Sequence, residues 1–145
     1  MSDLNPVFGV LPYDLNSSLF SDYAKKKRFV WMPENVKANY IADNKSLDFP
    51  EGSILIKNFY YDNVVPSGNS QIIETRLMIK KEGEWTFANY LWNEDQTEAF
   101  FTTSGSLVSL QWIDDVGETQ TVNYQVPPFS QCFACHNNGS TLPFP

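Results

Sequence analysis

The chain has 145 residues, which is the size of one ordinary domain and is long enough to bury a core without disulfides. Its formal net charge of -7 argues against nucleic-acid binding, because phosphate recognition needs a basic surface. No stretch approaches the ~20 apolar residues that cross a bilayer, and the many aromatic residues favour a sheet-rich globular protein.

The N-terminal sequence MSDLNPVFGVLPYD has neither the basic region nor the apolar region of a signal peptide. Turn residues follow, together with a short predicted helix from about Ser18 or Ser21 to Lys27, whose first turn a Ser or Asp can cap. The basic cluster at 25–28 then forms the solvated end of that helix. It does not alternate with aromatic residues, as a nucleic-acid stacking platform would.

From residue 29 onward the sequence predicts strands. Segments rich in β-branched and aromatic residues end at turn residues, and they cover 29–32, 36–42, 52–62, 71–81, 84–92, 96–103, 106–114 and 118–127. The turn Glu82-Gly83 predicts a hairpin between two of them. Short strands with almost no helix predict a mainly β fold, an antiparallel β-sandwich or jelly-roll-like domain over residues 1–128.

The segment 71–81 alternates, so that Ile73, Thr75, Leu77 and Ile79 face one way and Glu74, Arg76, Met78 and Lys80 the other. We interpret Glu74 and Arg76 as a salt bridge on one face rather than a catalytic pair. The acidic residues at 94–98 are interpreted as a turn. With a single histidine, the chain offers no Ser-His-Asp relay, and we expect no catalysis by this chain alone.

Residues 130–137 read SQCFACHN and hold both cysteines and the only histidine of the chain. The spacing C-x-x-C-H is typical of covalent attachment of a c-type haem. In a helical turn, Cys132 and Cys135 lie three residues apart on one face, where they can reach two vinyl groups, and His136 follows as the axial iron ligand. We therefore predict that residues 129–145 form a short helical segment that binds haem c.

Other interpretations of the motif stay open. A thiol–disulfide switch places C-x-x-C at a helix start in a βαβ unit, which this β-rich chain does not show. A zinc site would have only a carboxylate or water as its fourth ligand. The cysteines could also be inert. In the alternative function, the domain binds carbohydrate or protein through Tyr60, Tyr61, Tyr90 and Trp92, although aromatic residues on strands usually belong to a core.

The second axial ligand of such a haem has no clear candidate within the chain. The methionines besides Met1 are Met32 and Met78, and both are interpreted as packing residues in strands. Nine residues follow His136. We therefore expect the distal ligand, and the helices that enclose a haem, to lie beyond Pro145.

Five sequence blocks resemble, in order, the β-rich region before the haem motif of bacterial multi-haem, often di-haem, c-type cytochromes. They are LPYDLNSSLFSDYAKKKRFVWMP, LDFPEGSILIKNFYY, IIETRLMIKKEGEW, YLWNEDQTEA and YQVPPFSQCFACHN. The likeness runs from about Leu11 to Asn137 and implies extracytoplasmic, for example periplasmic, electron transfer. It implies that Cys132 and Cys135 occupy the thioether positions and that His136 is the proximal ligand.

The same resemblance implies that relatives continue beyond the motif into sequence that carries another haem. It also implies a redox partner protein, and some relatives sit beside sugar-oxidising dehydrogenase modules, which makes a partner of that kind an analogy. Because haem attachment takes place outside the cytoplasm, we expect a leader that this sequence lacks. Haem loading would then depend on the attachment machinery of the host.

Overall fold

The computed structural model describes residues 4–17, 19–43 and 45–136. These residues form a mainly β protein, as predicted, and contain one short helix. The elements are β1 (Val10–Tyr13), β2 (Lys25–Trp31), β3 (Ile54–Val64), β4 (Asn69–Lys81), β5 (Glu84–Trp92), β6 (Ala99–Thr102), β7 (Ser106–Ile113), β8 (Thr119–Val126) and α1 (Ser130–Cys135).

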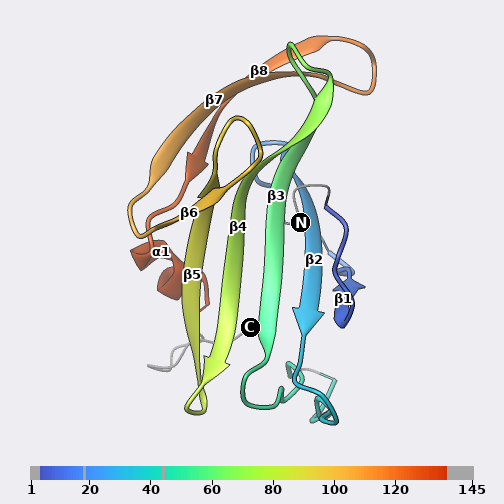
Figure 1. The fold of residues 1–145 in the computed structure, drawn as a ribbon, viewed down its shortest axis with the longest axis vertical. Helices are drawn as coiled ribbons and strands as arrows, with labels where there is room; N and C mark the ends of the chain where they lie inside the picture. Colours follow the sequence, from blue (N-terminus) through green and yellow to red (C-terminus); the bar gives the residue numbers. More distant parts are fainter. Residues whose placement is uncertain (1–3, 18, 44, 137–145) are drawn as a thin grey trace.

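The strands form one antiparallel sheet in which β1 to β6 lie side by side in chain order. The β7–β8 hairpin leaves this path and arches across one end of the sheet, where Trp112 pairs with Val64 at the end of β3 (Figure 1). All eight strands thus belong to one hydrogen-bonded sheet. The finer prediction of a sandwich or jelly roll is not confirmed by this strand order.

The predicted hairpin between β4 and β5 is present. Lys81 pairs with Glu84 across the two-residue turn, in which Glu82 and Gly83 have φ angles of 57° and 81°. Two positive φ angles match the twist of the flanking strands, and glycine adopts the second one without a steric penalty. The hairpin holds β4 and β5 in fixed register.

The predicted helix ending at Lys27 is wrong within the described residues, and Ser18 lies outside them. Asp22 and Tyr23 have φ angles of 46° and 63°, which a right-handed helix does not allow. The basic cluster at 25–28 instead begins β2, which pairs with β3 from Lys25↔Tyr60 to Trp31↔Ile54. Pairing over seven residues outweighs the weak local preference for a helix.

Three other predictions at the sheet margin differ from the structure. The segment 36–42 is not a strand and forms only an isolated bridge between Asn39 and Asp48. The segment 96–103 becomes a strand only at Ala99, because the Asn93 side chain accepts hydrogen bonds from two backbone N–H groups in the turn that follows β5. The short strand β1 lies before residue 29, where the sequence predicts no strand.

The core consists of separate clusters on the two faces of the sheet. The largest lies between β3, β4 and the β7–β8 hairpin and includes Phe59, Tyr61 and Tyr124. A second cluster lies under α1 and joins Met78, Trp85, Phe87 and Cys132. The third cluster, Val10, Phe29 and Ile56, lies on β1, β2 and β3.

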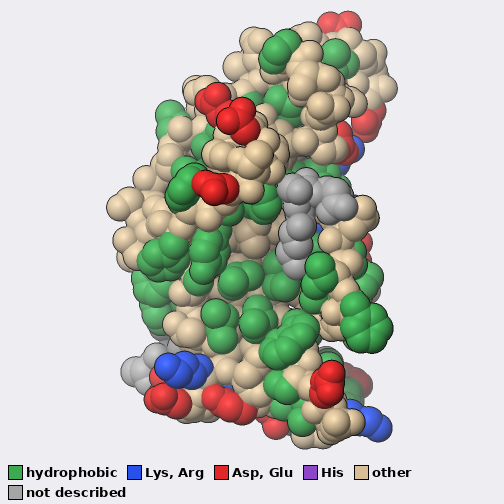
Figure 2. Space-filling model, in the orientation of Figure 1, with side chains coloured by type: hydrophobic (Ala, Val, Ile, Leu, Met, Phe, Trp, Pro, Cys, Tyr) green, Lys and Arg blue, Asp and Glu red, His purple; other side chains and the backbone are tan. Residues whose placement is uncertain are grey.

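One broad side of the sheet carries exposed hydrophobic surface. Figure 2 shows hydrophobic side chains gathered over the middle strands of that side, with few Lys or Arg among them. No described helix is long and apolar enough to cross a membrane.

Candidate functional site

Helix α1 carries the C-x-x-C-H motif and is held beside the sheet at the end of β8. The N–H group of Phe129 donates to the carbonyl of Thr103 at 3.0 Å. A Cβ atom added to Gly105 would lie 3.0 Å from the carbonyl oxygen of Val126 and 3.1 Å from Cδ of Pro128. The close approach of these segments leaves little room for a side chain at position 105 just before the helix.

Aromatic contacts fix the orientation of α1. The Phe87 ring of β5 lies 6.2 Å from the Phe129 ring and 5.1 Å from the Phe133 ring, both edge-on. The imidazole of His136 lies 5.5 Å from the same Phe87 ring. Edge-on aromatic pairs add stabilisation beyond burial. Phe87 therefore anchors the helix and restricts the position of the imidazole.

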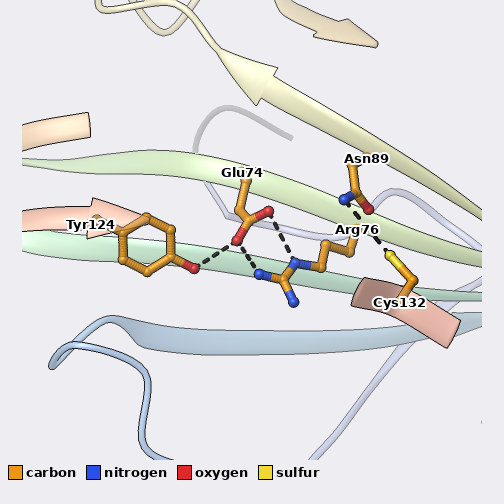
Figure 3. A network of polar contacts seen from close by, with 5 residues as sticks. All are labelled: Glu74, Arg76, Asn89, Tyr124 and Cys132. Carbon is orange, nitrogen blue, oxygen red and sulfur yellow. Dashed lines mark hydrogen bonds and ion pairs between the residues drawn. The ribbon is translucent and has the colours of Figure 1, made fainter. Parts of the chain in front are cut away.

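The two cysteines lie in different environments, and both are free thiols. Cys132 is buried in the cluster with Met78 and Phe87, and Nδ2 of Asn89 donates to its sulfur at 3.9 Å (Figure 3). Burial raises the pKa of the Cys132 thiol, although Arg76 nearby opposes this effect. Cys135 is exposed. The pair thus combines one accessible thiol with one protected thiol.

The predicted site residues Cys132, Cys135 and His136 all line one cavity of about 340 Å³, which we call the motif cavity. Its apolar walls include Leu55, Met78 and Phe87, and its lining also includes Arg28, Lys57 and Arg76. Apolar walls with a few converging polar groups are the usual character of a small-molecule site. The structure therefore brings the three motif residues to the border of one amphipathic cavity.

Three basic side chains lie in a row across the sheet, on one face of β2, β3 and β4. Arg28 pairs with Lys57, and Lys57 pairs with Arg76. We call these three residues the cationic row. The sequence analysis missed it, because alternation shows which residues of one strand share a face but does not show which strands pair or in what register.

Glu74 neutralises one member of the cationic row. Its buried carboxylate accepts hydrogen bonds from Nε and Nη2 of Arg76 at 3.0 and 2.5 Å, and from the Tyr124 hydroxyl at 2.6 Å (Figure 3). The predicted Glu74–Arg76 salt bridge is thus confirmed. The surrounding face is covered by α1 and β8, and Met78 on it is buried. The burial and the Glu74 charge together raise the pKa of Tyr124.

The other two cations are less well compensated. Nη1 of Arg28 contacts the exposed carboxylate of Asp14 at 3.2 Å, and the side chain of Arg28 is only 5% exposed. Its Nη2 atom is buried without a hydrogen-bond partner among the described residues. Burial, reinforced by Arg28 and Arg76, lowers the pKa of Lys57 to about 8. This part of the cavity therefore carries unbalanced positive charge.

Two observations concern the zinc site and the aromatic platform named as alternatives. In the described part of the chain, no group of three or more His, Cys, Asp or Glu side chains is arranged to hold a metal ion. Haem attachment does not need such a group, because thiols bond to vinyl carbons and only the imidazole reaches the iron. Tyr61 is 1% exposed and belongs to the core, so it cannot share an exposed platform with Tyr60, Tyr90 and Trp92.

Comparisons with protein-family models, with curated proteins and with solved structures found no match to this chain.

Proposed function

We propose that this chain is the β-rich part of an extracytoplasmic electron-transfer protein that binds haem c covalently through Cys132 and Cys135, with His136 as an axial ligand. In this proposal residues 1–128 form the supporting domain and residues 129–145 form the haem-attachment segment. The observation that carries it is the placement of all three motif residues at the border of the motif cavity.

The residues around the motif have the chemistry that a haem requires. Leu55, Met78 and Phe87 offer apolar contacts to a porphyrin plane, and the basic residues of the lining offer donors to its carboxylates. The buried Nη2 atom of Arg28, which has no partner among the described residues, is a donor for which a ligand would supply the acceptor. The donor set therefore fits the group that the motif spacing implies.

The cysteines and the histidine have separate roles in this proposal. The thiols of Cys132 and Cys135 would hold the cofactor through thioether bonds, formed as each S–H adds across a vinyl double bond. The imidazole of His136 would hold the iron through a ring nitrogen, and the Phe87 ring beside it limits its rotation. When bound, the haem supplies a one-electron Fe(III)/Fe(II) couple.

Electron transfer would take place to a redox partner protein, for which a sugar dehydrogenase module is one candidate class. The chain is strongly acidic, with a formal net charge of -7. A charge of that sign speeds encounter with a basic partner surface, and the effect falls as the ionic strength rises.

The test is expression of the chain in cells with an export leader and a haem-attachment system, followed by the pyridine haemochrome spectrum of the purified, denatured protein. We expect the spectrum of a haem bound through two thioether bonds. The matched control is Cys132→Ala/Cys135→Ala, which should retain no haem after denaturation. Absence of covalent haem in the wild-type chain, in cells that mature a control cytochrome, would overturn the proposal.

A further inference from the structure

The motif cavity contains more positive charge than its acidic neighbours balance. Like charges that lie directly opposite one another on neighbouring strands repel, and the cationic row places Arg28 opposite Lys57 and Lys57 opposite Arg76. Glu74 pairs with Arg76, and Asp14, whose side chain is 90% exposed, reaches only Arg28. Among the described residues, Lys57 has no acidic side chain within ion-pair distance.

Contacts within the protein explain only part of this arrangement. Nζ of Lys57 lies 4.7 Å and Cζ of Arg76 lies 4.4 Å from the centre of the Phe59 ring, so both cations gain a favourable contact with its π face. The Nη2 atom of Arg28, in contrast, is buried without a hydrogen-bond partner in the described residues. A buried, unsatisfied donor on a charged group is costly, and it is the kind of group that a ligand satisfies.

The order of the residues across the sheet separates the two ends of the cavity. Arg76 lies on β4 beside Asn89, which contacts Cys132. Lys57 lies one strand away from Arg76, on β3. Arg28 lies two strands away from Arg76, on β2, which is about 10 Å at the usual strand spacing. The thiol end of the cavity is thus separated from its uncompensated positive end. A ligand that spans the cavity would therefore place its negative groups at the Arg28–Lys57 end. Its opposite edge would lie at the cysteines.

We propose that Arg28 and Lys57 form a carboxylate-binding site at the end of the motif cavity remote from Cys132, and that the carboxylates it takes are the propionates of the haem. This inference rests on the proposed function for the identity of the ligand. Arg76 acts differently, because its guanidinium is already paired with Glu74. Arg28 and Lys57 are therefore positioning residues that set which way the porphyrin lies in the cavity.

The test uses the full chain carrying Cys132→Ala/Cys135→Ala, so that no thioether can form, and metal-free protoporphyrin IX, so that no iron ligation contributes. Binding is followed by the shift of the porphyrin absorbance band and compared with binding of protoporphyrin IX dimethyl ester, which lacks the carboxylates. We expect the acid to bind at least about tenfold more tightly than the ester, because charge-assisted hydrogen bonds are involved.

Variants of Arg28 and Lys57 test whether these two residues cause the tighter binding of the acid. Lys57→Met and Arg28→Met, each added to the double-alanine chain, should reduce the preference for the acid, while ester binding should change little. Lys25→Met is the matched control, because Lys25 lies in the same basic cluster but pairs with Asp62 on the surface. It should keep the full preference. Lys57→Met keeps the test meaningful if loss of the buried Arg28 prevents folding.

Each outcome decides the inference. Equal binding of acid and ester, or no binding of either, would overturn it, and so would a preference that Lys57→Met leaves unchanged. If acetate or inorganic phosphate binds in a Lys57-dependent way while acid and ester bind equally, the site takes a small free anion and the propionate assignment is overturned. Covalent haem without acid preference would remove this inference alone, whereas acid preference without covalent attachment would retain the site and remove the proposed function.

Discussion

Nδ2 of Asn89 donates a hydrogen bond to the sulfur of Cys132 at 3.9 Å, inside a cluster where only 8% of Cys132 is exposed. Burial also raises the pKa of this thiol, so that less of it is in the reactive thiolate form at neutral pH. Cys135, three residues later, is exposed. The two thiols of the motif thus differ in accessibility, since Cys132 is protected and Cys135 is exposed.

This separation predicts unequal alkylation of the haem-free chain. With iodoacetamide at neutral pH, Cys135 should react faster than Cys132 by on the order of tenfold or more, because only its thiol is accessible. The single variants Cys132→Ala and Cys135→Ala assign the rates, and the difference should disappear in denaturant. Equal native rates would contradict the buried position of Cys132 and would favour a reactive thiol pair.

Replacing Lys57 by methionine should stabilise the haem-free protein. Its folded pKa of about 8 lies below the ordinary value of 10.5, so the folded state disfavours the charged form. The cost is fully present below the folded pKa and disappears as the pH rises through 10.5. We expect Lys57→Met to raise the free energy of unfolding at neutral pH by on the order of 1 kcal/mol, after allowance for solvent screening.

Urea unfolding of both proteins at neutral pH and near pH 10 measures this effect. The gain from Lys57→Met should shrink at the higher pH, where the wild-type lysine is largely neutral in the folded state. Lys25→Met, at an exposed ion pair, should change stability by less than about 0.5 kcal/mol. A destabilised Lys57→Met protein would show that the lysine is satisfied without a ligand.

Glu74→Gln should destabilise the protein strongly. The change leaves the largely buried guanidinium of Arg76 without its counter-charge, and we expect a loss of about 2–4 kcal/mol. Tyr124→Phe removes one hydrogen bond to the same carboxylate and should cost about 1.5–3 kcal/mol. Chemical denaturation of the two variants gives both values. A Glu74→Gln variant as stable as wild type would mean that the Glu74–Arg76 ion pair within β4 does not contribute to stability.

Gly105→Ala should loosen the packing of α1 against the sheet. The new methyl group would lie 3.0 Å from the carbonyl oxygen of Val126, so the chain before the helix must shift, at a cost of about 1–3 kcal/mol. We expect faster alkylation of Cys132 in this variant, because the helix packs less closely on β5. Ser104→Ala, at the exposed neighbouring position, is the control and should leave the rate unchanged.

Local patterns were sufficient for the parts of the fold that depend on neighbouring residues. The alternation in 71–81 and the Glu82-Gly83 turn predicted the β4–β5 hairpin, and the same-face spacing predicted the Glu74–Arg76 pair. The basic cluster at 25–28 was misread as a helix end, because its strand conformation comes from pairing with β3, about thirty residues away. Long-range pairing of this kind leaves little trace in a local pattern.

The candidate site was predicted in part for the same reason. Cys132, Cys135 and His136 are close in sequence, so their spacing indicated a shared site. The cationic row joins three strands, and its register depends on the bulge-free pairing of Lys57 with both neighbours. The face of Glu74 and Met78 also appeared polar by alternation, although α1 and β8 cover it. The burial of this face depends on segments far away in the sequence, and local alternation does not show it.

The most direct test of haem attachment is the intact mass of the denatured chain after export into a compartment with a haem-attachment system. We expect a mass increase equal to one haem, which Cys132→Ala/Cys135→Ala abolishes and Lys57→Met retains. An unmodified wild-type mass, in cells where a control cytochrome gains its haem, would contradict the proposal that this motif attaches a haem.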